Sequence, residues 1–115
     1  MDISVPQNVT FERYLAVTES DGVTPFDLST YELKGDLAQG GIIKAAFTLT
    51  DMGPLFTVTD LPGRIVDWIL DTETLATLKV GVKYDFDIIA IGPERTYPLV
   101  RKSTFTLTTG VTPAA

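Results

Sequence analysis

The chain contains no cysteine and no histidine among its 115 residues. The missing thiols exclude disulfides, thiolate zinc sites, iron–sulfur clusters and cysteine nucleophiles. The missing imidazoles remove the usual base of a serine hydrolase triad and the commonest metal ligand. Because the Ser and Thr hydroxyls lack that activating base, we expect no enzyme activity. Because thiolate and imidazole ligands are missing as well, we expect no metal and no cofactor.

Positive charge is also scarce. There are 9 Lys and Arg residues against 15 Asp and Glu, which gives a net charge of −6 at neutral pH. Such a chain repels phosphate backbones and anionic lipids, so we expect neither nucleic acid nor a membrane surface as a partner. The N-terminus carries neither a basic segment nor an apolar one, and Lys44 and Thr48 interrupt the longest apolar stretch. No signal peptide and no membrane span are therefore predicted.

What the sequence does contain is a two-residue alternation of apolar and polar side chains. In one run Tyr84 and Phe86 alternate with Asp85 and Asp87. Similar runs recur about every ten residues between Gly and Pro turns, a spacing typical of sandwiches and barrels. We predict an all-β fold of about seven short strands in two antiparallel sheets. The predicted core residues are Phe47, Trp68, Tyr84, Phe86 and Phe105.

Two segments depart from a plain strand pattern. Residues 71–78 begin with a capping Asp and place Leu75 and Leu78 three apart, which predicts one short helical turn between the sheets. The strand-like run 9–17 changes period near Tyr14, which predicts a bulge or an edge position. The expected organisation is an N-terminal arm over residues 1–8, a β-sandwich domain over 9–108 and a flexible C-terminal tail over 109–115.

Carboxylates and glycines are the remaining candidates for chemistry, and each has a simpler interpretation. Asp85 and Asp87 leave the same face of a strand, which favours a solvated outer face over an acid–base pair or a cation site. The pair Gly40-Gly41 lacks the spacing of a phosphate loop and is interpreted as a hairpin turn. No Asp-x-Asp-x-Asp loop supports calcium binding by the other aspartates considered, which are Asp21, Asp27 and Asp36.

Partner contacts are expected at the last hairpin, the last strand and the two termini. Arg95, Arg101 and Lys102 flank Tyr97, a basic and aromatic cluster suited to an acidic partner. We expect the Thr residues of the last strand to face outward on an edge strand that can pair with another chain. Both termini can cross to a neighbour, with plain disorder as the alternative. The candidate contacts are Met1, Val5, Tyr14, Arg95, Tyr97, Arg101 and Val111, while Tyr14, Phe26 and Tyr97 are the candidates for binding a carbohydrate.

Several short strings follow one another along most of the chain. They are Phe11-Glu12-Arg13-Tyr14, Asp21-Gly22-Val23-Thr24-Pro25-Phe26-Asp27-Leu28-Ser29-Thr30-Tyr31, Gly63-Arg64-Ile65, a loosely spaced set (Thr74, Leu75, Leu78, Gly81, Tyr84, Phe86, Asp87) and Val111-Thr112-Pro113. In these strings the chain resembles small structural proteins of tailed-phage virions. It also resembles the N-terminal immunoglobulin-like sandwich of baseplate upper proteins, which anchors receptor-binding parts to a tail.

The resemblance implies an antiparallel immunoglobulin-like β-sandwich that serves as a non-enzymatic virion building block in the tail, baseplate, neck or fibre anchor. The alternatives are a capsid decoration protein that stabilises the head shell and a carbohydrate-binding module. The implied partners are further copies, as a trimer or hexamer, and other virion proteins. The implied location is the virion, after assembly in the host cytoplasm. A baseplate protein of that kind continues into a coiled-coil or receptor-binding region where this chain stops, so the resemblance does not extend to host-receptor binding and leaves that role open.

Overall fold

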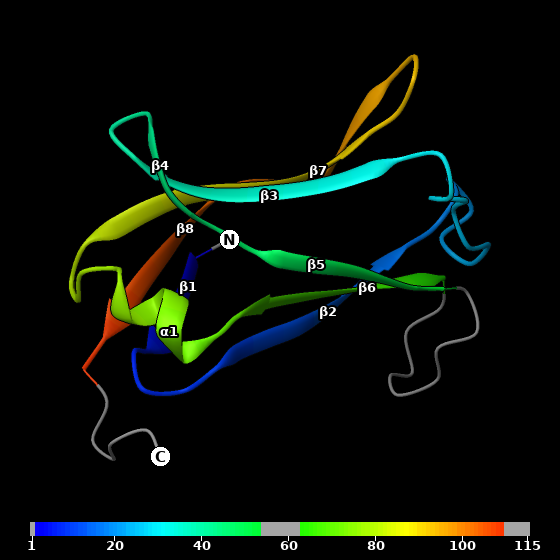
Figure 1. Cartoon of the computed structure of the whole chain (residues 1–115). Helices are drawn as coiled ribbons and strands as arrows, with labels where there is room; N and C mark the ends of the chain where they lie inside the picture. Colours follow the sequence, from blue (N-terminus) through cyan, green and yellow to red (C-terminus); the bar gives the residue numbers. More distant parts are fainter. Residues whose placement is uncertain (1, 54–62, 110–115) are drawn as a thin grey trace.

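The alternating runs of the sequence form strands in the computed structural model, which describes residues 2–53 and 63–109 (Figure 1). In chain order the elements are β1 (Asp2–Pro6), β2 (Phe11–Val17), β3 (Glu32–Gln39), β4 (Ile42–Ala46), β5 (Thr48–Gly53), β6 (Arg64–Leu70), α1 (Thr72–Ala76), β7 (Lys83–Ile91) and β8 (Thr96–Thr108). The predicted helical turn is confirmed as α1, whose N-terminus is capped by the Asp71 carboxylate accepting from Thr74 N–H at 2.8 Å.

The strands form two sheets that pack face to face, which confirms the predicted β-sandwich (Figure 1). The five-stranded sheet has the order β1-β8-β7-β3-β4, and the three-stranded sheet has the order β2-β6-β5. The described residues thus form eight strands rather than about seven. One pair, β1 with β8, is parallel, whereas every other strand pair is antiparallel.

The core between the sheets is built from aromatic rings, as predicted. Trp68 of β6 is 3% exposed and packs edge-to-face on Phe47 at 5.1 Å and on Phe11 at 5.2 Å. Phe86 and Phe105, from β7 and β8, approach the same rings from the five-stranded sheet. Offset and edge-to-face contacts of this kind add to the free energy of area burial, so this cluster holds the two sheets together.

The N-terminal segment differs from the expected arm. Residues 2–6 form β1, which pairs in parallel with β8, and Thr104 Oγ1 donates to the Asp2 carboxylate. Ile3 and Val5 are 2% and 7% exposed because the period of two turns both side chains into the core. Val5 is therefore a core residue and not a free contact. The candidate Met1 lies outside the described residues.

The last strand is also placed differently from expectation. β8 lies between β1 and β7 over residues 104–108, so this part of the strand is not an edge, and its outward Thr104 and Thr106 are paired with β1. The edges of the two sheets are instead β1, β4, β2 and β5. β2 is thus an edge strand, one of the two predictions for its irregular period, and it pairs with β6 in unbroken register. Of the expected tail, residues 110–115 with Val111 lie outside the described residues.

Candidate functional site

Three aromatic side chains from separate segments meet at one end of the sandwich. Phe26 belongs to the β2–β3 connection, Tyr31 directly precedes β3, and Tyr97 is near the start of β8. The ring centroids lie 5.5 Å apart for Phe26 and Tyr31, 5.6 Å for Phe26 and Tyr97, and 5.9 Å for Tyr31 and Tyr97. All three side chains are partly buried. We call these three residues the aromatic cluster.

Backbone hydrogen bonds fix the segment that carries Phe26 and Tyr31. Phe26 N–H donates to the carbonyl of Val17 at 3.2 Å, which ties this segment to the end of β2. The Asp27 carboxylate accepts from Ser29 N–H at 2.9 Å, and Tyr31 N–H donates to the Leu28 carbonyl at 3.0 Å. Such an Asx turn and the buried Leu28 below it hold the two rings in place without a regular strand or helix.

The β7–β8 hairpin approaches the cluster from the other side. A Cβ added to Gly92 would lie 2.4 Å from Cε1 of Tyr31, so the hairpin backbone rests directly on the tyrosine ring. Gly92 N–H donates to the carbonyl of Arg95 at 2.8 Å and closes the turn. Any side chain at position 92 would therefore move the Tyr31 ring or the hairpin.

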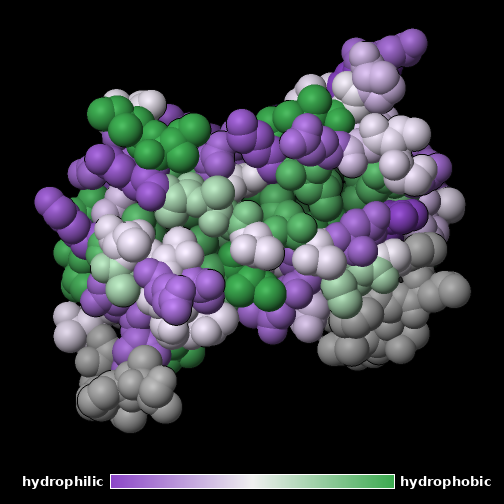
Figure 2. All heavy atoms as spheres, viewed as in Figure 1, coloured by the Kyte–Doolittle hydropathy of each residue, from purple (hydrophilic) through white to green (hydrophobic). Residues whose placement is uncertain are grey.

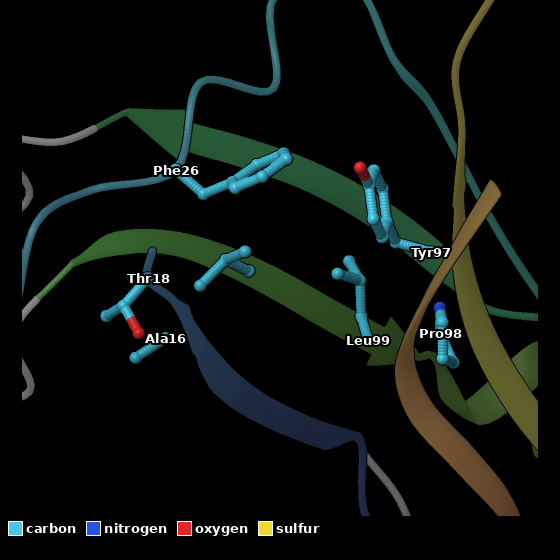
Figure 3. Close-up of a pocket in the computed structure, with 7 residues that line it drawn as sticks. Ala16, Thr18, Phe26, Tyr97, Pro98 and Leu99 are labelled. Carbon is cyan, nitrogen blue, oxygen red and sulfur yellow. The ribbon is translucent and has the colours of Figure 1, made fainter. Parts of the chain in front are cut away.

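Two hollows of about 300 Å³ each flank Tyr97. Figure 3 shows the first, with Phe26 on one side and Tyr97, Pro98 and Leu99 on the other; Thr18 also lines it. The second hollow lies against Tyr31 and Tyr97 and is lined on its other side by polar and proline residues, namely Thr30, Pro93, Glu94 and Arg95. This volume is at the lower end of the range for small-molecule pockets. Tyr97 thus forms a ridge between an apolar hollow and a polar one.

Tyr31 keeps its phenol proton at neutral pH. The pKa of Tyr31 is raised above its ordinary value, first by burial and then by Tyr97, while the nearby Arg95 acts against the rise. A neutral phenol can both donate and accept a hydrogen bond. The cluster therefore presents apolar ring faces together with polar hydroxyls.

A second feature is a carboxyl pair on the outer face of the three-stranded sheet. Asp67 of β6 is 8% exposed and lies opposite Tyr14 of β2. Its pKa is raised to about 6, first by burial and then by the hydrogen bond and charge of Glu12. Among the described residues, no hydrogen bond reaches Asp67 Oδ1. Because the pKa of the buried Asp67 lies close to neutral pH, the stability of the fold should depend on pH at this site.

The outer face of the five-stranded sheet is solvated, as predicted for Asp85 and Asp87. Both are exposed, whereas Tyr84, Phe86 and Ile88, which alternate with them, are buried. Lys102 Nζ lies 4.0 Å from the Asp85 carboxylate, an exposed pair that contributes little free energy. In residues 2–53 and 63–109 no group of acidic side chains is arranged to hold a metal ion. The pair Gly40-Gly41 forms the β3–β4 hairpin turn, with φ of 59° and 80°.

The edge strand β4 exposes apolar side chains that the sequence reasoning did not single out. Ile42 and Ile43 are 62% and 60% exposed, the latter on the outer face beside Ala38 and Ala46. In Figure 2 a hydrophobic patch lies at the upper left, where Figure 1 shows the β3–β4 hairpin. The sequence did not indicate that Ile42 and Ile43 are exposed, because the alternation of apolar residues with Lys44 is the same as in a strand with one buried face.

The remaining predicted contacts are dispersed over the fold. Arg95 and Tyr97 lie at the aromatic cluster, together with Phe26, one of the proposed carbohydrate contacts. Arg101 is exposed further along β8, whereas Tyr14 lies on the other sheet. Tyr31 was missed because Tyr31 and Leu33 alternate with Glu32, a pattern that favoured a core position, and no local signal shows that Tyr31 meets Tyr97.

Comparisons with known proteins identify no relative of this chain. No family model, no curated protein and no solved structure matches the chain. Among the described residues no helix is both long and apolar enough to cross a membrane. The fold thus defines the chain as a β-sandwich protein.

Proposed function

We propose that this chain is a non-enzymatic structural protein of a tailed-phage virion, which assembles through contacts between copies of the sandwich. The observation that carries the proposal is the β4 edge, which combines unpaired strand backbone with exposed Ile42 and Ile43. An exposed edge strand is a template for another strand, and natural proteins usually protect such edges with charge, proline or a covering loop. On β4 the only charged side chain is Lys44, which lies beside the exposed Ile42 and Ile43. The resemblance to virion proteins supports the same role.

A second copy of the chain is the occupant that fits this edge best. A symmetric pairing of two β4 strands centred on Lys44 would place two lysines opposite each other, which is destabilising. The other edge of the same sheet, β1, instead carries Asp2, whose charge is opposite to that of Lys44. We therefore propose that β4 of one copy pairs with β1 of the next.

Pairing of β4 with β1 determines the type of contact between the copies. A contact between two different surfaces is heterologous, and it closes into a ring if its rotation allows. The trimer or hexamer expected from the resemblance is such a ring. The tail, baseplate, neck or fibre anchor uses rings of this symmetry, and capsid decoration at a three-fold or quasi-six-fold position is the alternative. The protein would reach either place after assembly in the host cytoplasm, with other virion proteins as neighbours.

Engineered cysteines test the proposed contact, since the chain has none of its own. Ser4 and Ala46 are exposed and face outward on β1 and β4. Under oxidation the Ser4→Cys Ala46→Cys double variant should form covalent rings, while each single variant stays uncrosslinked. A covalent dimer from Ala46→Cys alone would indicate symmetric β4 pairing instead. Mass spectrometry of purified phage particles tests the virion role, and absence of the protein from them would contradict it.

A further inference from the structure

We propose that the aromatic cluster and its two hollows form a binding site for a neutral carbohydrate. This inference goes beyond the assembly role and does not depend on it. β3 starts beside the cluster and ends at the β3–β4 hairpin, so the two features lie at opposite ends of this strand (Figure 1). One copy can therefore use the β4 edge for assembly and the cluster for a ligand.

The first argument is the shape of the site. Tyr97 lines both hollows, so a ligand that spans them must pass over its ring. Phe26 closes the far side of the first hollow and Tyr31 lines the second. The C–H face of a sugar ring is apolar and flat, and it packs on aromatic faces of this kind. A short oligosaccharide would place successive sugar rings on the two sides of Tyr97.

The second argument is hydrogen-bonding chemistry. A sugar hydroxyl both donates and accepts, so it matches a site that offers both kinds of group. The second hollow provides the Glu94 carboxylate as an acceptor and the Arg95 guanidinium as a donor. The Thr30 hydroxyl in the same hollow can both donate and accept. The opposite charges of Glu94 and Arg95 favour a neutral ligand over an anionic or cationic one.

A proline-rich peptide is the main competing occupant, since such peptides dock in grooves lined by aromatic rings. Proline has no N–H, so a peptide of this kind presents mostly carbonyl acceptors. The Arg95 guanidinium can donate to those carbonyls, but the Glu94 carboxylate in the same hollow would find few donors on such a peptide. The donor and acceptor pattern of the second hollow therefore favours the carbohydrate.

The third argument is that the rings are held before a ligand arrives. Gly92 contacts the Tyr31 ring, the Asx turn at Asp27 fixes the segment between Phe26 and Tyr31, and the three rings pack on one another. A preformed site avoids the entropic cost of ordering side chains upon binding. Gly92→Ala should therefore weaken binding by displacing Tyr31, although position 92 does not line either hollow.

The test uses the full chain on an array of neutral and acidic oligosaccharides, with an array of proline-rich peptides alongside. We expect binding to at least one neutral oligosaccharide. Tyr97→Ala should weaken that binding by about tenfold or more, since central aromatic residues dominate most interfaces. Tyr14→Ala is the matched control, because Tyr14 is also a partly buried tyrosine but lies on the other sheet. Its effect should stay below about threefold.

Chemical-shift mapping of the unmutated protein makes the result independent of how the variants fold. Addition of the array-selected oligosaccharide should shift amide signals of the segments around Phe26, Tyr31 and Tyr97. The proposal would be overturned if no neutral glycan binds, if only acidic glycans bind, or if the amide shifts are confined to the other sheet. Binding of a proline-rich peptide alone would assign the site to a peptide partner.

Discussion

Replacing Asp67 by Asn should stabilise the protein at neutral pH and leave its stability at pH 4 almost unchanged. The Asp67 side chain is 8% exposed, and its pKa rises from 3.8 to about 6 upon folding because of burial and the neighbouring Glu12. A carboxyl with a raised pKa in the folded state favours the fold when protonated. Its contribution is therefore full below about pH 4 and is lost as the pH rises to about 6.

The size of the effect follows from the same pKa. A full change from 3.8 to about 6 corresponds to roughly 3 kcal/mol of lost stability above pH 6. Glu12 is exposed, so water screens part of this, and we expect about 1–3 kcal/mol. An Asn side chain has nearly the same shape and no charge, so Asp67→Asn should recover this free energy at pH 7 to 8.

Urea denaturation at several pH values measures this directly, with the single Trp of the chain as the fluorescent probe. Trp68 is buried, so its emission reports unfolding. Asp87→Asn is the control, because Asp87 is exposed on the outer face of the other sheet and should change stability by less than about 0.5 kcal/mol. A stability difference between Asp67→Asn and the wild type that does not vary with pH would refute the reasoning.

Substitutions at three further positions test the packing and the helix cap. Trp68→Ala should lower the free energy of unfolding by about 3–5 kcal/mol in urea melts, and a loss below about 1 kcal/mol would show that Trp68 lies on the surface. Val5→Asp should destabilise the fold by several kcal/mol, measured by thermal denaturation, because it buries a charge in the core; a free arm would tolerate it. Asp71→Ala should cost about 1 kcal/mol through the lost α1 cap, and Asp71→Ser should restore most of it in the same melts.

The sandwich could be predicted because its main signal is local. In β7 the alternation of Tyr84 and Phe86 with Asp85 and Asp87 fixes which side faces the core. The helical turn was predictable for the same reason, since the Asp71 cap and the apolar Leu75 lie within one turn.

The elements whose positions were predicted wrongly depend on contacts between segments that are distant in the sequence. β1 is short, ends in a proline and pairs with β8 about a hundred residues away, so nothing near Val5 indicates a strand in the core. The same pairing places residues 104–108 of β8 inside the sheet and not at its edge. The aromatic cluster is also non-local, because Phe26, Tyr31 and Tyr97 come from two connections and a strand. The sequence supplied Phe26 and Tyr97 as candidates but no reason to place them together.

The central claim is that copies assemble through the β4 edge, and light scattering of the wild type and of Ile43→Lys across a range of concentrations tests it most directly. Lysine is a residue that natural edge strands use to prevent pairing, and at this exposed position it should leave the fold intact. We predict a trimer or hexamer for the wild type and a monomer for Ile43→Lys. A wild type that stays monomeric at every concentration, or a variant that keeps the wild-type mass, would contradict the account.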